Sequence, residues 1–232
     1  MILAVLSDIH ANLPALRAAV AAAEARGADE LVNLGDVVGY GPSPVECLDV
    51  VRAEFAVNVL GNHDAAVAGA DDPALPPDGQ AAVALHRALL DDDRRAWLAS
   101  LPLVVERHHA TFAHAAPLQP ERWPRLESAR DARRQFGAFE TDVCFVGHSH
   151  RQAIVADTLG VFRVRRGHRF LVDVGSVGQP RDHDPRLGLA LFDTEAFSVE
   201  LVREHYDHAQ TVAEIARVGL PRDLGDRLGV GL

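Results

Sequence analysis

The most constraining feature of this chain is a repeated local pattern in which a short apolar run ends in histidine, aspartate or asparagine. Such runs cover residues 2–6, 31–34, 55–60, 110–113 and 143–146. Short continuous apolar runs of this kind predict buried strands. Ligand sites in α/β sheets lie beyond the carboxyl ends of the strands. The pattern therefore predicts that five strand ends deliver polar side chains to one crevice.

The segments between these runs indicate the fold class. Helices are predicted at 15–26, capped by Asn12 with Pro14 in the first turn, and at 43–53. We expect a loop at 71–79, helices at 80–99 and 128–139, and a strand at 103–106. Further strands are predicted at 153–156, 161–164, 170–174, 189–192 and 198–202, before a helix at 211–218. Parallel β/α units followed by antiparallel strands predict two stacked sheets with helices outside, in one domain covering 1–232.

Composition limits the partners. The formal net charge of −10 argues against a large nucleic-acid surface or an anionic membrane as partner. No run reaches the ~18 apolar residues of a membrane span, and no cleavage site follows the apolar start, so we expect a cytoplasmic protein. Cys47 and Cys144 lie in apolar runs and are expected to be buried, reduced thiols. The sequence carries no indication of the oligomeric state.

The polar side chains at the five strand ends have the chemistry of metal ligands. Mixed nitrogen and oxygen donors suit Mn²⁺, Fe²⁺ or Zn²⁺ better than Ca²⁺ or Mg²⁺. The set is too large for one ion and suits two, in which case one carboxylate must bridge. Two divalent ions would also supply the positive charge that an anionic phosphate needs in an acidic protein. Any one motif alone fits an ordinary turn or a structural histidine, whereas all of them in this order do not. The candidate ligands are Asp8, His10, Asp36, Asn62, His114, His148 and His150.

The motifs together resemble the calcineurin-like metallophosphoesterase family over residues 2–180. The family pattern is D-x-H, G-D, G-N-H-[DE], a lone His and G-H-x-H. It is matched by Asp8-Ile9-His10, Gly35-Asp36, Gly61-Asn62-His63-Asp64, His114 and Gly147-His148-Ser149-His150. SDIHAN, GDVVGYGP, LGNHD and GSVGQPRD are similar to its small bacterial and archaeal branch. Ala11 stands where Gly is common and Asp173-Val174 where Asn-Pro is common, and neither departure touches a ligand.

The resemblance implies an αββα sandwich and a role for each motif residue. Asp8, His10, Asp36 and His150 would bind a first ion, and Asn62, His114 and His148 a second, with Asp36 bridging. His63 would face the phosphate and Asp64 would orient His63. The expected nucleophile is a hydroxide bridging the ions, because two divalent cations strongly lower the pKa of water. The expected activity is therefore that of a metal-dependent phosphoric ester hydrolase acting on a small phosphate ester.

Several residues remain open between a functional and a structural role. Arg181 either clamps a substrate phosphate or is a structural arginine. Tyr40 either lines the pocket or packs after a turn. Trp123, in the loop after His114, is a candidate for stacking on a nucleobase, and the sequence does not decide whether it has this role. Asn12 is predicted to cap a helix rather than contact substrate. Seven histidines outside the motifs are expected to be solvated or structural: His86, His108, His109, His168, His183, His205 and His208.

Two functional alternatives also remain. Phosphodiester hydrolysis, with nucleotides included, competes with phosphomonoester hydrolysis, because the metal core serves both. The loops at 66–80 and 117–127 carry no readable code that would decide between them. The other alternative is a catalytically idle scaffold or binding protein on the same fold. The complete ligand set and His63 argue against it.

Overall fold

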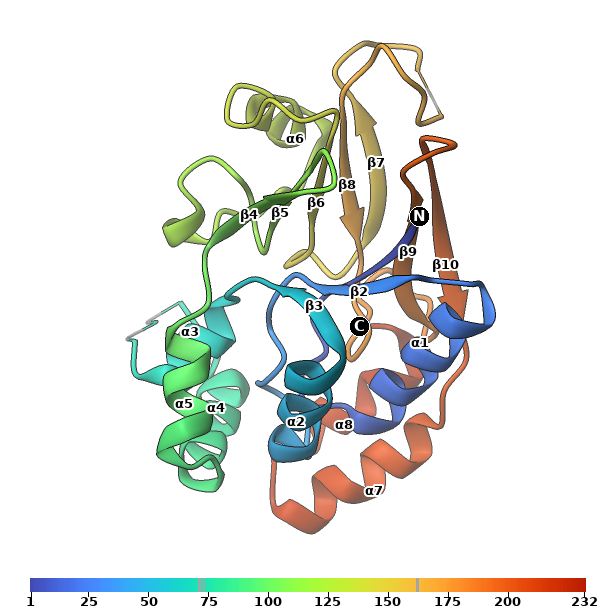
Figure 1. The fold of residues 1–232 in the computed structure, drawn as a ribbon. Helices are drawn as coiled ribbons and strands as arrows, with labels where there is room; N and C mark the ends of the chain where they lie inside the picture. Colours follow the sequence, from blue (N-terminus) through green and yellow to red (C-terminus); the bar gives the residue numbers. More distant parts are fainter. Residues whose placement is uncertain (71, 73, 162) are drawn as a thin grey trace.

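Two five-stranded mixed sheets form the centre of the protein (Figure 1). The computed structural model describes residues 1–70, 72, 74–161 and 163–232. The first sheet has the order β10–β9–β1–β2–β3, with bounds Ile2–Leu6 (β1), Glu30–Asn33 (β2), Phe55–Asn58 (β3), Leu187–Asp193 (β9) and Ser198–Glu204 (β10). The second has the order β4–β5–β6–β8–β7, with bounds Val104–Arg107 (β4), Ala110–Ala113 (β5), Val143–Val146 (β6), Gln152–Ala156 (β7) and Phe170–Val174 (β8).

Helices cover the outer faces of both sheets. In Figure 1 the helices α1, α2, α7 and α8 lie on the side of the first sheet away from the second, and α6 lies beside β7 and β8. The helices are Leu13–Ala25 (α1), Pro44–Glu54 (α2), Asn62–Ala68 (α3), Pro77–Leu89 (α4), Asp92–Ala99 (α5), Ala129–Gln135 (α6), His208–Val218 (α7) and Asp223–Asp226 (α8), with short 3₁₀ turns at Pro120–Arg122 and Leu228–Val230. The predicted αββα sandwich of two stacked mixed sheets is therefore confirmed.

Strand direction brings the motif-bearing ends together. The strands β1, β2 and β3 are parallel neighbours, and so are β5, β6 and β8. In the first sheet, β9 pairs antiparallel with β1, and β10 pairs antiparallel with β9. In the second sheet, the edge strands β4 and β7 pair antiparallel with β5 and β8, respectively. Parallel strands end at one edge of a sheet, so the residues that follow β1, β2 and β3, and those that follow β5 and β6, emerge at common edges.

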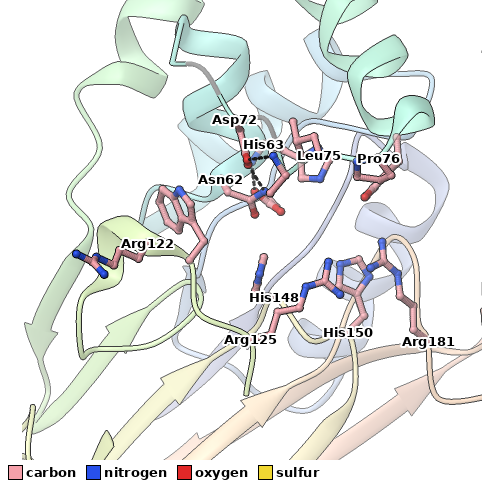
Figure 2. A pocket seen from close by; sticks show the side chains of 14 residues that line it. Asn62, His63, Asp72, Leu75, Pro76, Arg122, Arg125, His148, His150 and Arg181 are labelled. Carbon is pink, nitrogen blue, oxygen red and sulfur yellow. Dashed lines mark hydrogen bonds between the residues drawn. The ribbon is translucent and has the colours of Figure 1, made fainter. Parts of the chain in front are cut away.

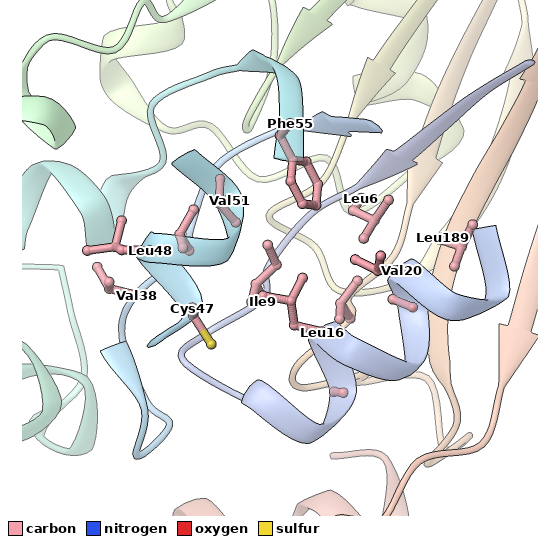
Figure 3. Packing of buried hydrophobic residues seen from close by; sticks show 14 of the residues in the cluster. Leu6, Ile9, Leu16, Val20, Val38, Cys47, Leu48, Val51, Phe55 and Leu189 are labelled. Atoms are coloured by element: carbon pink, nitrogen blue, oxygen red, sulfur yellow. The ribbon is translucent and has the colours of Figure 1, made fainter. Parts of the chain in front are cut away.

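Side-chain alternation along the strands of the first sheet builds one core on each of its faces. Leu3 and Val5 point into the layer between the sheets, where the rings of Phe112 and Phe145 stack at 5.6 Å. Leu6, by contrast, points toward the helices on the other face. Figure 3 shows Leu16, Val20, Leu48 and Val51 of α1 and α2 filling this helix-side core around Leu6 and Ile9. Burial on both faces explains why these strands read as continuous apolar runs.

Several boundaries differ from the sequence prediction. The helix predicted at 80–99 is two helices, because Leu90 leaves the helical conformation and Asp91 caps α5 through a hydrogen bond to the Arg94 N–H. The loop predicted at 71–79 ends early, since α4 begins at Pro77, and Asp71 and Pro73 lie outside the described residues. Helix α3 was not predicted.

The predicted strand at 161–164 is wrong for its described residues Val161, Arg163 and Val164, while Phe162 lies outside the described part. This segment belongs to the connection between β7 and β8, and its described residues take no part in the pairing of either sheet. Both cysteine thiols are buried and free within the described ranges, as expected. Among the described residues, no helix has the length and apolar character needed to cross a membrane.

Candidate metal centre

All seven predicted ligand residues meet where the two sheets face each other at their carboxyl edges. The first sheet supplies Asp8 and His10 after β1, Asp36 after β2, and Asn62 at the start of α3. The second sheet supplies the other three, after β5 and β6: His114, His148 and His150. All except His148 are buried, and His148 is half-buried. The predicted convergence of five strand ends on one crevice is therefore present in the structure.

Five of these seven residues hold a left-handed backbone conformation. The φ angles are 52° for Asp8, 48° for His10, 54° for Asp36, 66° for His148 and 62° for His150. Non-glycine residues rarely adopt positive φ, and each such residue costs on the order of 1–3 kcal/mol unless its surroundings impose it. Residues of this kind concentrate at functional sites, so the backbone itself marks this crevice as one.

The first cluster combines Asp8, His10 and His150. The Oδ1 atom of Asp8 lies 3.2 Å from His150 Nε2 and 3.7 Å from His10 Nε2. It is buried without a hydrogen-bond partner, while Asp8 Oδ2 accepts from the backbone N–H of His148 at 2.9 Å. Burial alone would raise the pKa of Asp8, but the neighbouring His150, His114 and His10 lower it below the ordinary range. A buried carboxylate oxygen without a donor is costly, which indicates a site for a cation.

Backbone carbonyls fix the orientation of three histidine rings. The Nδ1 atoms of His10, His114 and His150 lie at hydrogen-bonding distance from the carbonyl oxygens of Val38, Leu34 and Gln179, respectively. A carbonyl only accepts, so each Nδ1 must carry a proton, and in the neutral form of each ring the lone pair of Nε2 faces the centre. Metal-binding histidines are held by hydrogen bonds of this kind.

The second cluster is built around His114. Its Nε2 atom lies 3.3 Å from Asp36 Oδ2, 3.3 Å from Asn62 Oδ1 and 3.2 Å from His148 Nδ1. Burial alone would lower the pKa of His114, but the Asp36 carboxylate raises it to about 9 in the metal-free protein. One imidazole proton cannot serve three acceptors, whereas a cation surrounded by these four atoms would serve them all.

Donor spacing in both clusters fits metal coordination. Two nitrogen ligands on one ion at about 2.1 Å, separated by tetrahedral or octahedral angles, lie about 3.0–3.4 Å apart. His10 Nε2 and His150 Nε2 are 3.2 Å apart, as are His114 Nε2 and His148 Nδ1. Because the Nδ1 protons are held by carbonyls, the lone pairs of His10 and His150 face each other directly. The residues present therefore fit borderline divalent ions.

Asp36 connects the two clusters. Its Oδ2 atom lies 3.8 Å from His10 Nε2 in the first cluster and 3.3 Å from His114 Nε2 in the second. The other oxygen, Oδ1, accepts from the backbone N–H of His63 at 2.8 Å, which fixes the carboxylate plane. A side chain at Gly61 would collide with this carboxylate, so glycine is required there.

Two residues missed by the sequence analysis hold ligands in place. Asp72 accepts a hydrogen bond from Asn62 Nδ2 at 3.2 Å (Figure 2). This bond leaves the amide oxygen of Asn62 to face His114. Gln179 holds His150 through its carbonyl oxygen, and its side-chain Oε1 accepts from Arg181 Nη2 at 2.6 Å. Neither residue belongs to a motif, although Gln179 lies in the glycine-rich GSVGQPRD segment.

His63 lies beside both clusters, but Asp64 does not contact its ring. One ring nitrogen of His63 lies within 4.8 Å of a ligand atom of His10 and of Asp36, and His63 Nδ1 is buried against Gly39 without a hydrogen-bond partner. Burial is the main cause of the lowered pKa of His63. Asp64 instead accepts from the backbone N–H groups of Val38 and Gly61, so the expected orientation of His63 by Asp64 is not observed. The physical reason is that Asp64 lies in the first turn of α3, where one oxygen accepts from the N-cap amide of Gly61 and the other from the amide of Val38 in the loop after β2.

A pocket opens above the clusters, and its wall carries cationic and aromatic side chains. Figure 2 shows Asn62 and His63 on one side and His148, His150, Arg125 and Arg181 on the other. Trp123 and Tyr40 also line this pocket. The Arg181 guanidinium lies 5.4 Å above the Tyr40 ring, which packs against His63 at 4.4 Å, so Tyr40 both packs and lines the pocket.

The remaining weaker candidates have structural roles or lie away from the clusters. Asn12 caps α1 by accepting from the Ala15 N–H, as predicted. His86 is fully buried, with Nδ1 accepting from the Gly39 N–H and Nε2 facing the Gly41 carbonyl. His183, close to Arg181 in sequence, is exposed.

Comparison with known proteins places this geometry in a family. A model of the calcineurin-like phosphoesterase superfamily domain matches residues 1–196, and the chain belongs to this family. It is 34% identical over 241 residues to an uncharacterized protein of Methanocaldococcus jannaschii, covering 99% of this chain and 98% of that protein.

Two solved structures share the fold over the full length. A metallophosphoesterase from Sphaerobacter thermophilus is 34% identical with a TM-score of 0.88, covering 100% of this chain and 99% of that one. A hypothetical protein from Pyrococcus horikoshii OT3 is 21% identical with a TM-score of 0.83, covering 100% and 98%. The family match and the His and Asp groups that could hold ions agree with the sequence-based resemblance.

Proposed function

We propose that this protein is a phosphoesterase that depends on two divalent metal ions. The observation that carries the proposal is the position of Asp36, whose Oδ2 atom faces a nitrogen-rich cluster on either side. On this proposal Asp36 bridges the ions. The first ion is held by Asp8, His10, Asp36 and His150, and the second by Asp36, Asn62, His114 and His148. Mn²⁺, Fe²⁺ and Zn²⁺ suit these donors.

When bound, the two ions supply Lewis acidity that polarises a phosphoryl group and makes water nucleophilic near neutral pH. The chain itself supplies further positive charge at the pocket wall. Arg181 is held by Gln179 and Tyr40 and lines the pocket beside Arg125. We propose that these two guanidinium groups bind phosphoryl oxygens, because arginine presents several fixed N–H donors to such groups. They offset locally the net charge of −10.

His63 is proposed to act on the leaving group. Its Nδ1 is buried against Gly39, which leaves Nε2 as the nitrogen available to the pocket. On this proposal Nε2 carries a proton and donates a hydrogen bond to the leaving oxygen. Asp64 is proposed to support this position indirectly, by holding the Val38 and Gly61 amides on either side of the site.

The test is hydrolysis by the full chain after reconstitution with Mn²⁺. Bis-p-nitrophenyl phosphate, p-nitrophenyl phosphate and a nucleotide panel would be assayed alongside Asp36→Asn as the matched control. We expect about two ions per chain by elemental analysis and turnover of at least one ester that Asp36→Asn loses. Two bound ions without turnover of any ester would favour the scaffold alternative, and a metal content near zero would refute the proposal.

A further inference from the structure

A second cavity adjoins the metal-facing pocket. It lies between α6 and the strands β7 and β8, and its volume is about 370 Å³, compared with about 140 Å³ for the metal-facing pocket. Ligand pockets for small molecules have volumes of roughly 300–1,000 Å³, so the second cavity is large enough for an organic group. The two cavities share two lining residues, Arg125 and Arg181.

The shared arginines mark the boundary between the cavities. Arg181 donates to the side chain of Gln179, and its own carbonyl accepts from Arg151 Nε at 3.0 Å. Within the described ranges, no hydrogen bond or ion pair joins Arg125 or Arg181 to a carboxylate. A phosphate at this boundary would therefore meet two guanidinium groups that form no ion pair with an acidic side chain in the described part of the chain.

The walls beyond the boundary are partly apolar, and they also include charged residues of both signs: Glu127, Asp173 and Arg151. Leu126, Ala129, Val155 and Leu171 form apolar parts of the lining. The buried acidic residue is Asp173, whose oxygens already accept from the Ser149 hydroxyl and the Gly175 N–H. A ring with an apolar body would bury its surface against the apolar side chains of this lining.

His63 lines the metal-facing pocket and is absent from the lining of the second cavity. If His63 donates to the leaving oxygen, as proposed above, the leaving alcohol departs on the His63 side. The group in the second cavity must then be attached to the phosphate through a different oxygen. A phosphomonoester has no such group, but a phosphodiester does.

We infer that the second cavity binds the retained organic group of a phosphodiester, whose phosphate lies under Arg125 and Arg181. This inference rests on the proposed function and narrows its substrate class to diesters. In the reaction, the oxygen of water bonds to phosphorus while the bond from phosphorus to the leaving oxygen breaks. Of the two protons of that water, one is transferred in net terms to the leaving oxygen, which departs as an alcohol, and the retained group leaves on a phosphomonoester.

The experiment compares two diesters that share a leaving group. Methyl p-nitrophenyl phosphate and phenyl p-nitrophenyl phosphate carry the same charge and both release p-nitrophenolate, but they retain groups of different size. For the Mn²⁺-loaded wild-type chain, burial of the phenyl ring is expected to raise kcat/KM by about 10- to 100-fold over the methyl ester. The two esters differ in intrinsic reactivity, so the deciding quantity is how this ratio changes in variants.

Ala129 lines the cavity from an exposed position on α6, so Ala129→Trp can fill the cavity without disturbing the core. Ala153→Trp does the same from β7 and serves if the first variant fails to fold. Arg133→Trp, on the same helix and outside the cavity lining, is the matched control. Either filling variant is expected to lower the ratio of kcat/KM for the phenyl ester to kcat/KM for the methyl ester at least about tenfold. The control variant is expected to keep the wild-type ratio.

An unchanged ratio in both filling variants, or an equal fall for the control, would overturn the inference while leaving the proposed function standing. Turnover of the phosphomonoester p-nitrophenyl phosphate with higher kcat/KM than either diester would also overturn it. If neither diester nor monoester is hydrolysed by the metal-loaded chain, the proposed function itself fails.

Discussion

His86 is expected to make the protein sensitive to acid through the loop that carries Tyr40. The ring is fully buried, its Nδ1 accepts from the Gly39 N–H at 3.0 Å, and its Nε2 faces the Gly41 carbonyl at 2.9 Å. Protonation of Nδ1 would remove the acceptor that Gly39 needs. Burial is the main cause of a pKa lowered to about 4. Gly39 in turn contacts His63, so His86 supports the wall of the site through Gly39.

The size and sign of the effect follow from linkage. In the unfolded chain the ring titrates near its ordinary pKa of about 6.5. Between that pH and the lower pKa of the folded state, the unfolded state therefore binds a proton that the folded state does not bind. The contribution of His86 is fully present above about pH 6.5 and is lost as the pH falls toward 4. The full loss is roughly 3 kcal/mol, of which about 2.5 kcal/mol is lost by pH 4.5.

Urea unfolding of the metal-free chain at pH 7.5 and pH 4.5 measures this loss. Other buried histidines also titrate, so the comparison is with His86→Gln, whose amide can accept from Gly39 and donate to Gly41 without titrating. We expect the free energy of unfolding of the wild type to fall by about 2.5 kcal/mol more than that of the variant. His205→Gln, which replaces an exposed histidine, is the control, and its free energy of unfolding should change between the two pH values by as much as that of the wild type. Equal pH dependence of wild type and His86→Gln would refute the reasoning.

Three further predictions concern the centre and the core. Asp36→Asn should lose metal at both sites, whereas His114→Ala should mainly empty the second, as measured by elemental analysis; retention of two ions by Asp36→Asn would contradict bridging. His63→Gln should keep both ions but lose about 10²–10⁴ in kcat, with a smaller loss for p-nitrophenolate than for poor leaving groups; loss of metal would instead make His63 a ligand. Phe145→Ala, which removes a fully buried ring between the sheets, should cost about 3–5 kcal/mol in urea unfolding, and a cost below about 1 kcal/mol would show that the inter-sheet layer repacks.

The strand ends were predictable because apolar runs and the polar residues after them are local features of the sequence. The apolar run before Asp8 indicates both a buried strand and the side at which it ends. Metal-ligand chemistry could likewise be inferred from residue types alone. Helix α3 was missed because the turn-like Gly61-Asn62 pair begins it directly, and the helix is only 7 residues long.

The rest depends on tertiary structure. The left-handed backbone of Asp8 and His148 is imposed by contacts between the two sheets, such as the hydrogen bond from the His148 N–H to Asp8. Arg125 and Gln179 have no motif spacing, and only the folded chain shows that one lines the pocket and the other holds His150. His86 could be predicted as structural, but its link to Gly39 spans 47 residues.

The division of ligands between the two sheets has a mechanical consequence. Each cluster takes Asp or Asn from one sheet and histidine from the other, so an ion held by either would bond to both layers at once. Such an ion would cross-link the two sheets at the end of the sandwich where polar side chains replace apolar packing. Ligands that bind only the folded state stabilise it by mass action. Removal of the ions by a chelator should therefore increase local opening at this end of the sandwich before it affects the far end of the sheets. Amide hydrogen exchange at the residues after β1 and β6 would then report metal occupancy independently of turnover.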